Sequence, residues 1–296
     1  MLPVWTEPNI IDILAQTYTM KKLILLLFPL LLSAQTHRFV YHLQYKKDSL
    51  AQDFTKVNMI LDVNPDDVRF YPYSYAQTDS LNIVRGQSRS RWDDDLPAII
   101  RKRNSFENNS LILINDFFSL KSTDKMNWKL HSDTKVDGQY NLQKATTDFG
   151  GRQWIAWFCK DISLDEGPYK FRGLPGLIFE IEDTHQNYIF KLAKSMKFPK
   201  TYATPFLESF GGKKPLPVNE KTIARKQLEL YNDPLHDVAE AFKSNTNPDN
   251  TYYVLSVQIK SLDQLKGMSD ERRKMMLREN NPIEIDKAVK YPLNLR

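Results

Sequence analysis

The stretch GPYKFRGLPGLIFEIED, residues 167–183, combines three glycines and two prolines with apolar residues, and it then alternates between apolar and polar positions. Within Leu174-Pro175-Gly176-Leu177, proline stands where a type II turn needs φ near −65°, and glycine stands where that turn needs a positive φ. The alternation that follows over Leu177–Asp183 is typical of a half-buried strand. The stretch therefore predicts a tight turn that leads into a β-strand.

This strand has a predicted antiparallel partner in the alternating segment 187–198. If residues 184–187 form the hairpin loop, Ile181 lies opposite Phe190, Phe179 opposite Leu192, and Glu180 opposite Lys191. Apolar residues then meet on one face and opposite charges meet on the other. The agreement between loop and pairing favours a β-hairpin.

The glycines of the motif do not have the spacing of a phosphate-binding loop. A P-loop and a dinucleotide fingerprint need other glycine intervals and a following helix. The interval from Gly173 to Gly176 matches a nucleic-acid clamp formally, but Pro175 removes a backbone donor. We predict turn formation and core packing, with a partner or ligand surface built around the turn as the alternative. The residues singled out are Gly167, Pro168, Tyr169, Phe171, Gly173, Leu174, Pro175, Gly176, Leu177 and Ile178, together with Trp154 and Trp157.

Length and composition are those of a globular protein. The 296 residues are 41% hydrophobic and 26% charged, with a formal net charge of +5. That length allows one large domain or two small ones. Strand-like alternation occurs in segments 37–46, 55–63, 68–73, 110–116, 127–133, 138–149, 152–162 and 187–198. Consecutive strands with short turns favour an antiparallel sheet over βαβ units.

Helical spacing is concentrated near the C-terminus. It covers segment 220–244, with a break at Pro234, and segment 269–280, where Ser269 is the predicted N-cap. We predict a loop with a short helix over 91–106, a loop over 198–217 and a further strand within 251–262. The predicted fold class is therefore α+β and β-dominated, an antiparallel sheet with a few mainly C-terminal helices. Curvature of that sheet into a half-barrel is one option.

Residues 20–35, MKKLILLLFPLLLSAQ, have the order of regions found in a secretory signal peptide. Lys21 and Lys22 precede the apolar run Leu23–Leu32, and small or polar residues follow it. The run is shorter than the roughly 20 residues that cross a bilayer. A buried or internal apolar helix is the alternative.

A signal peptide begins at an initiator methionine, so we expect Met20 to be the true start and residues 1–19 to be an upstream extension. Residues 36–296 are then the mature chain, which we predict to be one domain without a transmembrane span. Export would place that domain in the periplasm or outside the cell.

Familiar catalytic and metal-binding signatures are missing from the sequence. It contains neither H-E-x-x-H nor G-x-S-x-G. Cys159 is the only cysteine, which excludes an intrachain disulfide, and we expect it to pack as a small apolar side chain. The triplet Asp93–Asp95 is either solvated loop charge or a site for a hard cation, and we favour the former. We therefore predict no cofactor, no metal and no nucleic-acid partner, and we assign no catalytic residue.

Residues 151–183, GRQWIAWFCKDISLDEGPYKFRGLPGLIFEIED, resemble the GLPGLI family of exported envelope proteins, named for the hexapeptide Gly173–Ile178. NWKLHSDTKVDGQYNLQKA and NNPIEID are similar to the preceding strands and the closing segment of that family. The resemblance implies a secreted or periplasmic protein whose function is largely unassigned. It implies no catalytic residue.

Three functions are compatible with these observations. The first is a non-enzymatic envelope protein that binds an apolar ligand or an envelope partner. The second is a secreted hydrolase whose site is assembled from distant residues. The third is an accessory protein of an outer-membrane receptor or transporter, which an exposed apolar patch near Tyr169 and Phe171 would favour.

Overall fold

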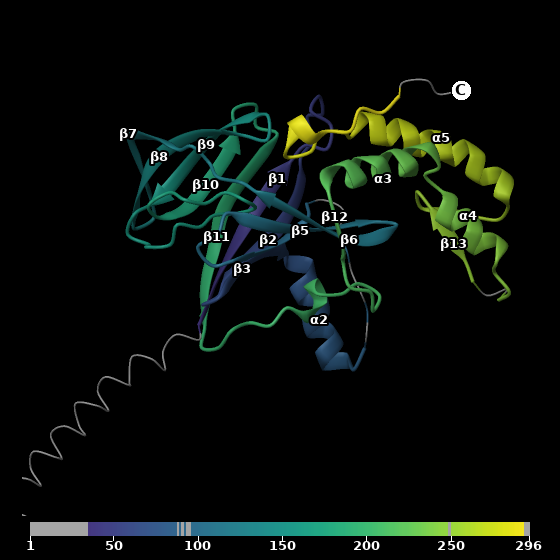
Figure 1. The fold of residues 1–296 in the computed structure, drawn as a ribbon, viewed down its shortest axis with the longest axis horizontal. Coiled ribbons are helices and arrows are strands. Elements are labelled where there is room, and N and C mark those ends of the chain that lie inside the picture. The colour runs from purple at the N-terminus through teal and green to yellow at the C-terminus, as the bar shows by residue number, and fades with distance from the viewer. Residues whose placement is uncertain (1–34, 88, 90–91, 93–95, 248–249, 293–296) are drawn as a thin grey trace, which may run out of the picture.

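The computed structural model describes residues 35–292, except for 88, 90–91, 93–95 and 248–249. The predicted signal peptide, the upstream extension and the triplet Asp93–Asp95 lie outside the described residues. The described chain folds mainly as strands, with the C-terminal helices gathered at one end of the molecule (Figure 1).

The strands are β1 (Thr36–Tyr45), β2 (Thr55–Val63), β3 (Asp67–Pro72), β4 (Ala98–Lys102), β5 (Glu107–Ile114), β6 (Asp116–Thr123), β7 (Lys129–Asp137), β8 (Tyr140–Phe149), β9 (Arg152–Cys159), β10 (Leu177–Asp183), β11 (Tyr188–Phe198) and β12 (Leu216–Val218). They form one twelve-stranded sheet in the order β12-β6-β5-β4-β3-β2-β1-β11-β10-β9-β8-β7. All neighbours are antiparallel except β12 and β6. The sheet is open, with β12 and β7 at its edges.

The helices are α2 (Tyr73–Arg85), α3 (Glu220–Asn232), α4 (His236–Lys243) and α5 (Leu262–Arg278), with short 3-10 turns η2 (Pro205–Leu207) and η3 (Ile285–Lys287). A small hairpin, β13 (Tyr252–Val254) and β14 (Val257–Ile259), lies between α4 and α5 in the chain. Figure 1 shows α3, α4 and α5 at the end opposite to β7 and β8. The predicted β-dominated α+β class is confirmed. None of the helices in the described part of the chain is both long enough and apolar enough to cross a membrane.

The first three strands form because alternate apolar residues share one face. Tyr41 and Leu43 of β1 and Met59 and Leu61 of β2 are fully buried, whereas His42 is exposed. The predicted meander is confirmed, since β1 pairs with β2 and β2 pairs with β3. Arg38 also becomes buried, because its guanidinium binds both carboxylate oxygens of Asp62 at 2.7 Å.

Several elements differ from the sequence prediction. Residues 91–106 were predicted to contain a short helix, yet they contain strand β4, because Ala98 and Ile99 are enclosed by the strands on either side. Helix α2 and strand β6 were not predicted. Residues 251–262 form two short strands instead of one. Helix α5 begins seven residues before the predicted N-cap, since Ser261, not Ser269, forms a capping box with Gln264.

The connection between β9 and β10, residues 160–176, lies against one face of the sheet. Tyr169 accepts a hydrogen bond from Arg101 of β4 through its carbonyl, while Phe171 packs against Trp154 of β9 with ring centroids 4.6 Å apart. In a flat sheet, β4 and β9 would be separated by six strand spacings, or about 29 Å. Residues 169 and 171 are at most about 7 Å apart. The sheet must therefore curve around this connection, which fills its inner face.

The core is correspondingly divided. The largest cluster joins the inner face of the sheet to the β9–β10 connection. A second cluster packs Tyr75 of α2 and Leu207 of η2 against the opposite face of β2–β5. Ile223 of α3 packs against Ile114 and Phe118, and a small separate cluster joins α4, the β13–β14 hairpin and α5. The helical end thus contributes its own apolar surfaces beside the sheet.

Candidate ligand-binding cleft

Gly176 allows the β9–β10 connection to pass directly over the end of β9. A Cβ atom built at this position would lie 2.0 Å from the carbonyl oxygen of Cys159, and φ is +153°. The predicted type II turn is not formed. The Gly176 N–H donates to the Leu174 carbonyl at 2.8 Å, and the Leu177 N–H donates to Ile162 instead of Leu174. The turn is tighter because Ile162 takes the hydrogen bond that would have closed the wider turn.

The hairpin that follows is formed as predicted. Glu180 pairs with Lys191, Ile181 with Phe190, and Glu182 with Ile189. The predicted pairing of Phe179 with Leu192 is not part of the β10–β11 register, because a β-bulge between Ile178 and Glu180 disturbs the pairing of β10. The bulge explains why Ile178, Phe179 and Ile181 are all buried, which a regular alternation would not allow.

Most motif residues lie inside the protein. Tyr169 is 3% exposed and Phe171 is fully buried, as are Trp154 and Cys159. Gly173 and Pro175 remain exposed, at the tip of the connection. Trp157 lies on the other face of β9, where Lys135 Nζ stands 4.6 Å from the ring centre. The structure therefore places most of the predicted motif residues around the inner core, against which Trp157 also packs, while Gly173 and Pro175 lie at the exposed tip.

The motif is anchored by buried ion pairs. Glu166 is fully buried and pairs with Arg101, while Arg172 binds Asp165 at 2.6 Å and lies 3.6 Å from Glu166. Lys170, two residues before Arg172, instead binds Glu284 of the C-terminal segment. Because buried charges are costly unless they are paired, these contacts fix the path of the connection across the sheet.

Lys170 and Tyr169 meet Glu284, which comes from the C-terminal segment 281–289. The Lys170 ammonium and the Tyr169 hydroxyl each donate to Glu284 at 2.6 Å, and Lys287 binds its other oxygen at 2.7 Å. Burial by itself raises the pKa of Glu284, but the charge of Lys170 and the three hydrogen bonds outweigh it and lower that pKa. Burial, with Glu284 as the next contributor, raises the pKa of Tyr169. Glu284 is therefore held as a carboxylate.

The two glycines between β8 and β9 make room for the same segment. A Cβ atom at Gly150 would lie 2.9 Å from Glu284, and one at Gly151 would lie 2.9 Å from Ile285. Arg152 then donates to the Ile283 carbonyl at 3.0 Å and to the Asn281 side chain at 2.6 Å. The segment NNPIEID, which has little internal pattern, is thus fixed to the sheet by contacts made at the glycine turn.

An open cleft of about 550 Å³ lies between the sheet, the inner connection and the C-terminal helices. Tyr169 and Lys170 of the motif line it, together with Ile112 and Leu120 of β5 and β6. From α3 the lining residues are Ile223, Gln227 and Leu230. From α5 they are Arg272, Met275, Met276 and Glu279. The segment 280–291 provides a further wall.

The two helices each present one face to this cleft. The lining positions of α3 are spaced by four and three residues, and those of α5 by three, one and three, so each set forms a single helical stripe. The stripe of α3 is mainly apolar, whereas the stripe of α5 has two methionines between Arg272 and Glu279. A mainly apolar concave site with a few polar groups is the usual character of a small-molecule pocket.

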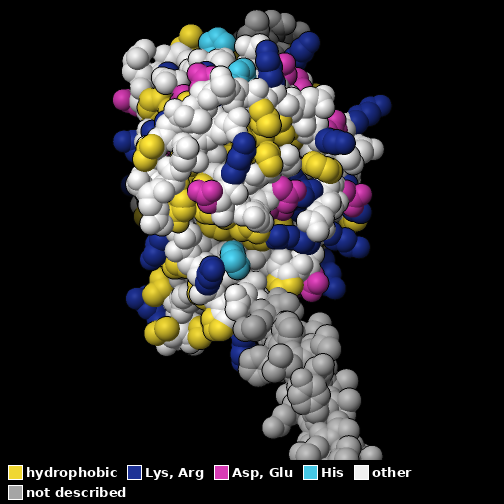
Figure 2. Space-filling view, turned by 90° about the vertical axis from the view of Figure 1, so that its left-hand side faces the viewer, with side chains coloured by type: hydrophobic (Ala, Val, Ile, Leu, Met, Phe, Trp, Pro, Cys, Tyr) yellow, Lys and Arg dark blue, Asp and Glu magenta, His cyan; other side chains and the backbone are white. Residues whose placement is uncertain are grey.

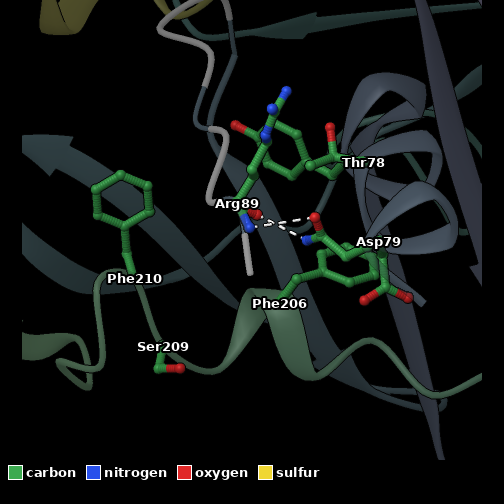
Figure 3. Close-up of a pocket in the computed structure, with 8 residues that line it drawn as sticks. Thr78, Asp79, Arg89, Phe206, Ser209 and Phe210 are labelled. Atoms are coloured by element: carbon green, nitrogen blue, oxygen red, sulfur yellow. Dashed lines mark hydrogen bonds between the residues drawn. The ribbon is translucent and has the colours of Figure 1, made fainter. Parts of the chain in front are cut away.

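A second, smaller pocket of about 60 Å³ lies beside α2 (Figure 3). Thr78 and Asp79 of α2 face Phe206 and Ser209 across it. The side-chain amide of Asn82 forms two hydrogen bonds with the backbone of Arg89, at 2.8 and 3.1 Å. This pocket has room for little more than water, so the larger cleft is the better candidate site.

Other candidate features do not converge on a site. No group of three or more metal-ligating side chains occurs within the described ranges. His42 and His131 are bonded to Asn58 and Thr146 at separate places on the sheet. On the face that covers β7 and neighbouring strands, apolar side chains form small groups among charged ones (Figure 2).

The cleft was not predicted from the sequence. The motif residues Tyr169 and Lys170 belong to it, but its helical walls come from residues more than 50 positions later. The one available signal was the spacing of Arg272, Met275, Met276 and Glu279 within a predicted helix. That spacing shows which residues share a face, but not which part of the sheet they meet.

A family model described as a protein of unknown function, Porph_ging, matches residues 150–180. The matched residues run from the glycine turn through the GLPGLI hexapeptide to β10, and that family has no assigned activity. The GLPGLI family itself stays a prediction. No curated protein matches the chain.

Two solved structures are similar to part of the chain. They are described as the structure of PNGF-II in the C2 space group and in the P21 space group, with 17% and 16% sequence identity and a TM-score of 0.49 each. Each alignment covers 65% of this chain and 32% or 33% of the other. The aligned part therefore spans about one third of those proteins, and similarity at this level carries no information about activity.

Proposed function

We propose that the mature protein is a non-enzymatic binding protein of the cell envelope that holds an apolar ligand in the cleft between β5, β6, α3 and α5. The observation that carries this proposal is the open, mainly apolar cleft of about 550 Å³, with one stripe from each helix facing it. Volumes of this order are typical of ligand pockets.

The carboxylates of the cleft favour binding over acid–base catalysis. Glu284 accepts hydrogen bonds from Tyr169, Lys170 and Lys287, and its pKa is lowered. A general acid or base works best with a pKa near the operating pH, which is the opposite shift for a carboxyl group. The other carboxylate, Glu279, binds Arg278 at 3.2 Å. Both acids are thus committed to ion pairs.

Docking of the motif on a receptor or transporter has less support. Such docking would use an exposed apolar patch around Tyr169 and Phe171. Both side chains are buried, and only Gly173 and Pro175 of the motif tip reach the surface. Ligand binding in the cleft does not require Tyr169 to become exposed, because its buried side chain already lines the cleft.

The compartment is part of the same proposal. The predicted signal peptide at residues 20–35 would deliver residues 36–296 to the periplasm or the exterior as one domain. A binding protein for apolar compounds is useful there, because such compounds must cross water to move between envelope layers.

The test is titration of the purified mature protein with the neutral dye N-phenyl-1-naphthylamine, followed by fluorescence. We expect saturable binding at one site per chain. Leu230→Trp and Met276→Trp add volume to the two helical walls and should each weaken dye binding by about tenfold, because added bulk cannot be accommodated in a formed site without strain.

Val84→Trp is the matched control, since Val84 is on α2, does not line the cleft and is 82% exposed. It should bind the dye as the unmodified protein does. Dye binding that is not saturable, or that survives both cleft substitutions, would refute the proposed function.

A further inference from the structure

We infer that the ligand of this cleft is an anionic amphiphile, a compound with one apolar chain and a carboxylate head group, and that Arg272 binds the head group. This inference rests on the proposed function and gives it a chemical class. It begins from the charges that line the cleft. Four of them are cations, Lys47, Lys170, Arg272 and Lys287, and two are anions, Glu279 and Glu284, which leaves a formal excess of two positive charges, 4 − 2.

Lys47 is not free, and Lys170 and Lys287 are paired with protein carboxylates. Lys170 binds Glu284 at 2.6 Å and Asp124 at 3.3 Å. Lys287 binds Glu220 and Glu284, each at 2.7 Å. The ammonium groups of Lys170 and Lys287 are thus directed toward protein carboxylates.

Arg272 is different. It makes no ion pair or hydrogen bond with any other described residue, although it is only partly exposed. Its neighbours in the basic run are both engaged: Arg273 binds Asp270 at 2.7 Å, and Lys274 binds Glu271 at 2.8 Å. Those two turn to acids on their own helix, whereas Arg272 lies on the stripe that faces the cleft.

The position of Arg272 on α5 places a cation at one end of an apolar stripe. Met275 and Met276 follow three and four residues later on the same helical face. Glu279 lies seven residues after Arg272, about 10.5 Å along the helix axis. At that separation its carboxylate does not contact the Arg272 guanidinium. Leu230 and Ile223 of α3 face the same space. An apolar chain along the methionines would therefore bring its head group to Arg272.

A guanidinium favours a planar anion. Its fixed fork of N–H donors matches the two oxygens of a carboxylate, and such charge-assisted bonds are about twice as strong as neutral ones. A phosphomonoester carries nearly two negative charges at neutral pH, whereas a carboxylate carries one. One unpaired guanidinium therefore balances a carboxylate, and the apolar wall binds the chain.

The test uses two competitors of equal chain length, decanoate and 1-decanol, in displacement of N-phenyl-1-naphthylamine from the mature protein. We expect decanoate to displace the dye at a concentration about tenfold lower than 1-decanol, as one charge-assisted hydrogen-bonded pair would provide. In Arg272→Gln the ratio of the two concentrations should fall to about 1. Arg272→Lys should give an intermediate ratio, because it keeps the charge and loses the fork.

Lys274→Gln is the matched control, since it removes the same charge two residues away at a side chain paired with Glu271 outside the cleft. It should keep the tenfold ratio. A ratio near 1 in the unmodified protein, or an unchanged ratio in Arg272→Gln, overturns the inference while dye binding still supports the proposed function. Absence of saturable dye binding overturns both.

Discussion

At the scale of single residues, Gly176 shows why the motif tolerates no side chain at its centre. The backbone of the β9–β10 connection comes so close to β9 that a Cβ atom would meet the Cys159 carbonyl at 2.0 Å. The contact is with main-chain atoms, which cannot move aside without shifting β9. Glycine is required at position 176 because the backbone lies so close to β9, more than because of the type II turn that the sequence predicts.

We predict that Gly176→Ala lowers the free energy of unfolding by about 3 kcal/mol or more, because strand β9 must move to relieve the clash. Urea denaturation measures the change. Gly138→Ala is the control: Gly138 also has a positive φ, +57°, but nothing lies within 4 Å of its added Cβ atom. It should cost only about 1 kcal/mol. Equal costs at the two positions would show that the close approach is unimportant.

The lowered pKa of Glu284 predicts how the stability of the protein depends on pH in acid. Its folded-state pKa is lowered, so its contribution to stability is complete above the ordinary carboxyl pKa of 4.5 and is lost as pH falls through the lower folded-state pKa. In Glu284→Gln this loss should disappear, because no proton is taken up at that position.

At neutral pH the same variant should be less stable by about 3 kcal/mol, since Lys170 loses a buried partner. Urea midpoints between pH 3 and pH 7 test both statements. Glu271→Gln, which breaks an exposed pair with Lys274, should change neither the midpoint at neutral pH nor its slope with acid by a comparable amount. A Glu284→Gln protein with the unmodified acid profile would contradict this account.

At the scale of elements, α5 shows that a helix can begin well before the residue that its local pattern predicts as the N-cap. Ser269 has a side chain suited to an N-cap, but the helix already extends across it because Ser261 and Gln264 form a capping box eight residues earlier. The sequence SLDQ contains that signal. The N-cap was predicted at Ser269 because the helical spacing is clearer in the charged segment that follows it.

We predict that Ser261→Ala lowers the stability of the helical end by about 1 kcal/mol, since the backbone N–H of Gln264 at the start of α5 loses its side-chain acceptor. Hydrogen exchange of the amides in α5 measures the effect locally. Ser269→Ala is the control and should be neutral or slightly stabilising, because alanine is the better residue inside a helix. The reverse order of effects would place the N-terminus of α5 at Ser269.

Strands were easier to predict than their surroundings. Alternation identified β1, β2 and β11 because each has one face on the core, and opposite charges fixed the β10–β11 register. Helix α2 lacked a comparable signal, because only Tyr75 and Ala76 of its residues are buried. Strand β4 was hidden by its flanking charges, of which Arg101 becomes buried only through Glu166, which is 65 residues away in sequence.

At the scale of the whole molecule, the prediction of export can be tested without knowledge of the ligand. The protein recovered from the periplasm or the medium should begin close to Gln35, as measured by mass spectrometry of the intact chain. Replacement of Leu25 and Leu27 by arginine should retain the protein in the cytoplasm, because charges in the apolar run prevent its recognition.

Deletion of residues 1–19 is the companion experiment and should leave export unchanged if Met20 is the true start. Exported protein that still carries residues 1–19 would refute both the start site and the signal peptide. This outcome would not alter the cleft, which is built from residues 45–291.

The C-terminal segment also sets the time at which the fold can be completed. The Asn281 side chain donates to the Lys46 carbonyl at 2.7 Å across a sequence separation of 235 residues. The backbone carbonyl of Asn281 accepts a hydrogen bond from the Tyr188 hydroxyl. Chains are synthesised at roughly 5–20 residues per second. The end of the first strand therefore waits roughly 10–50 s for its last partner. During that interval the first strand and its neighbours in the sheet lack the contacts that the C-terminal segment provides.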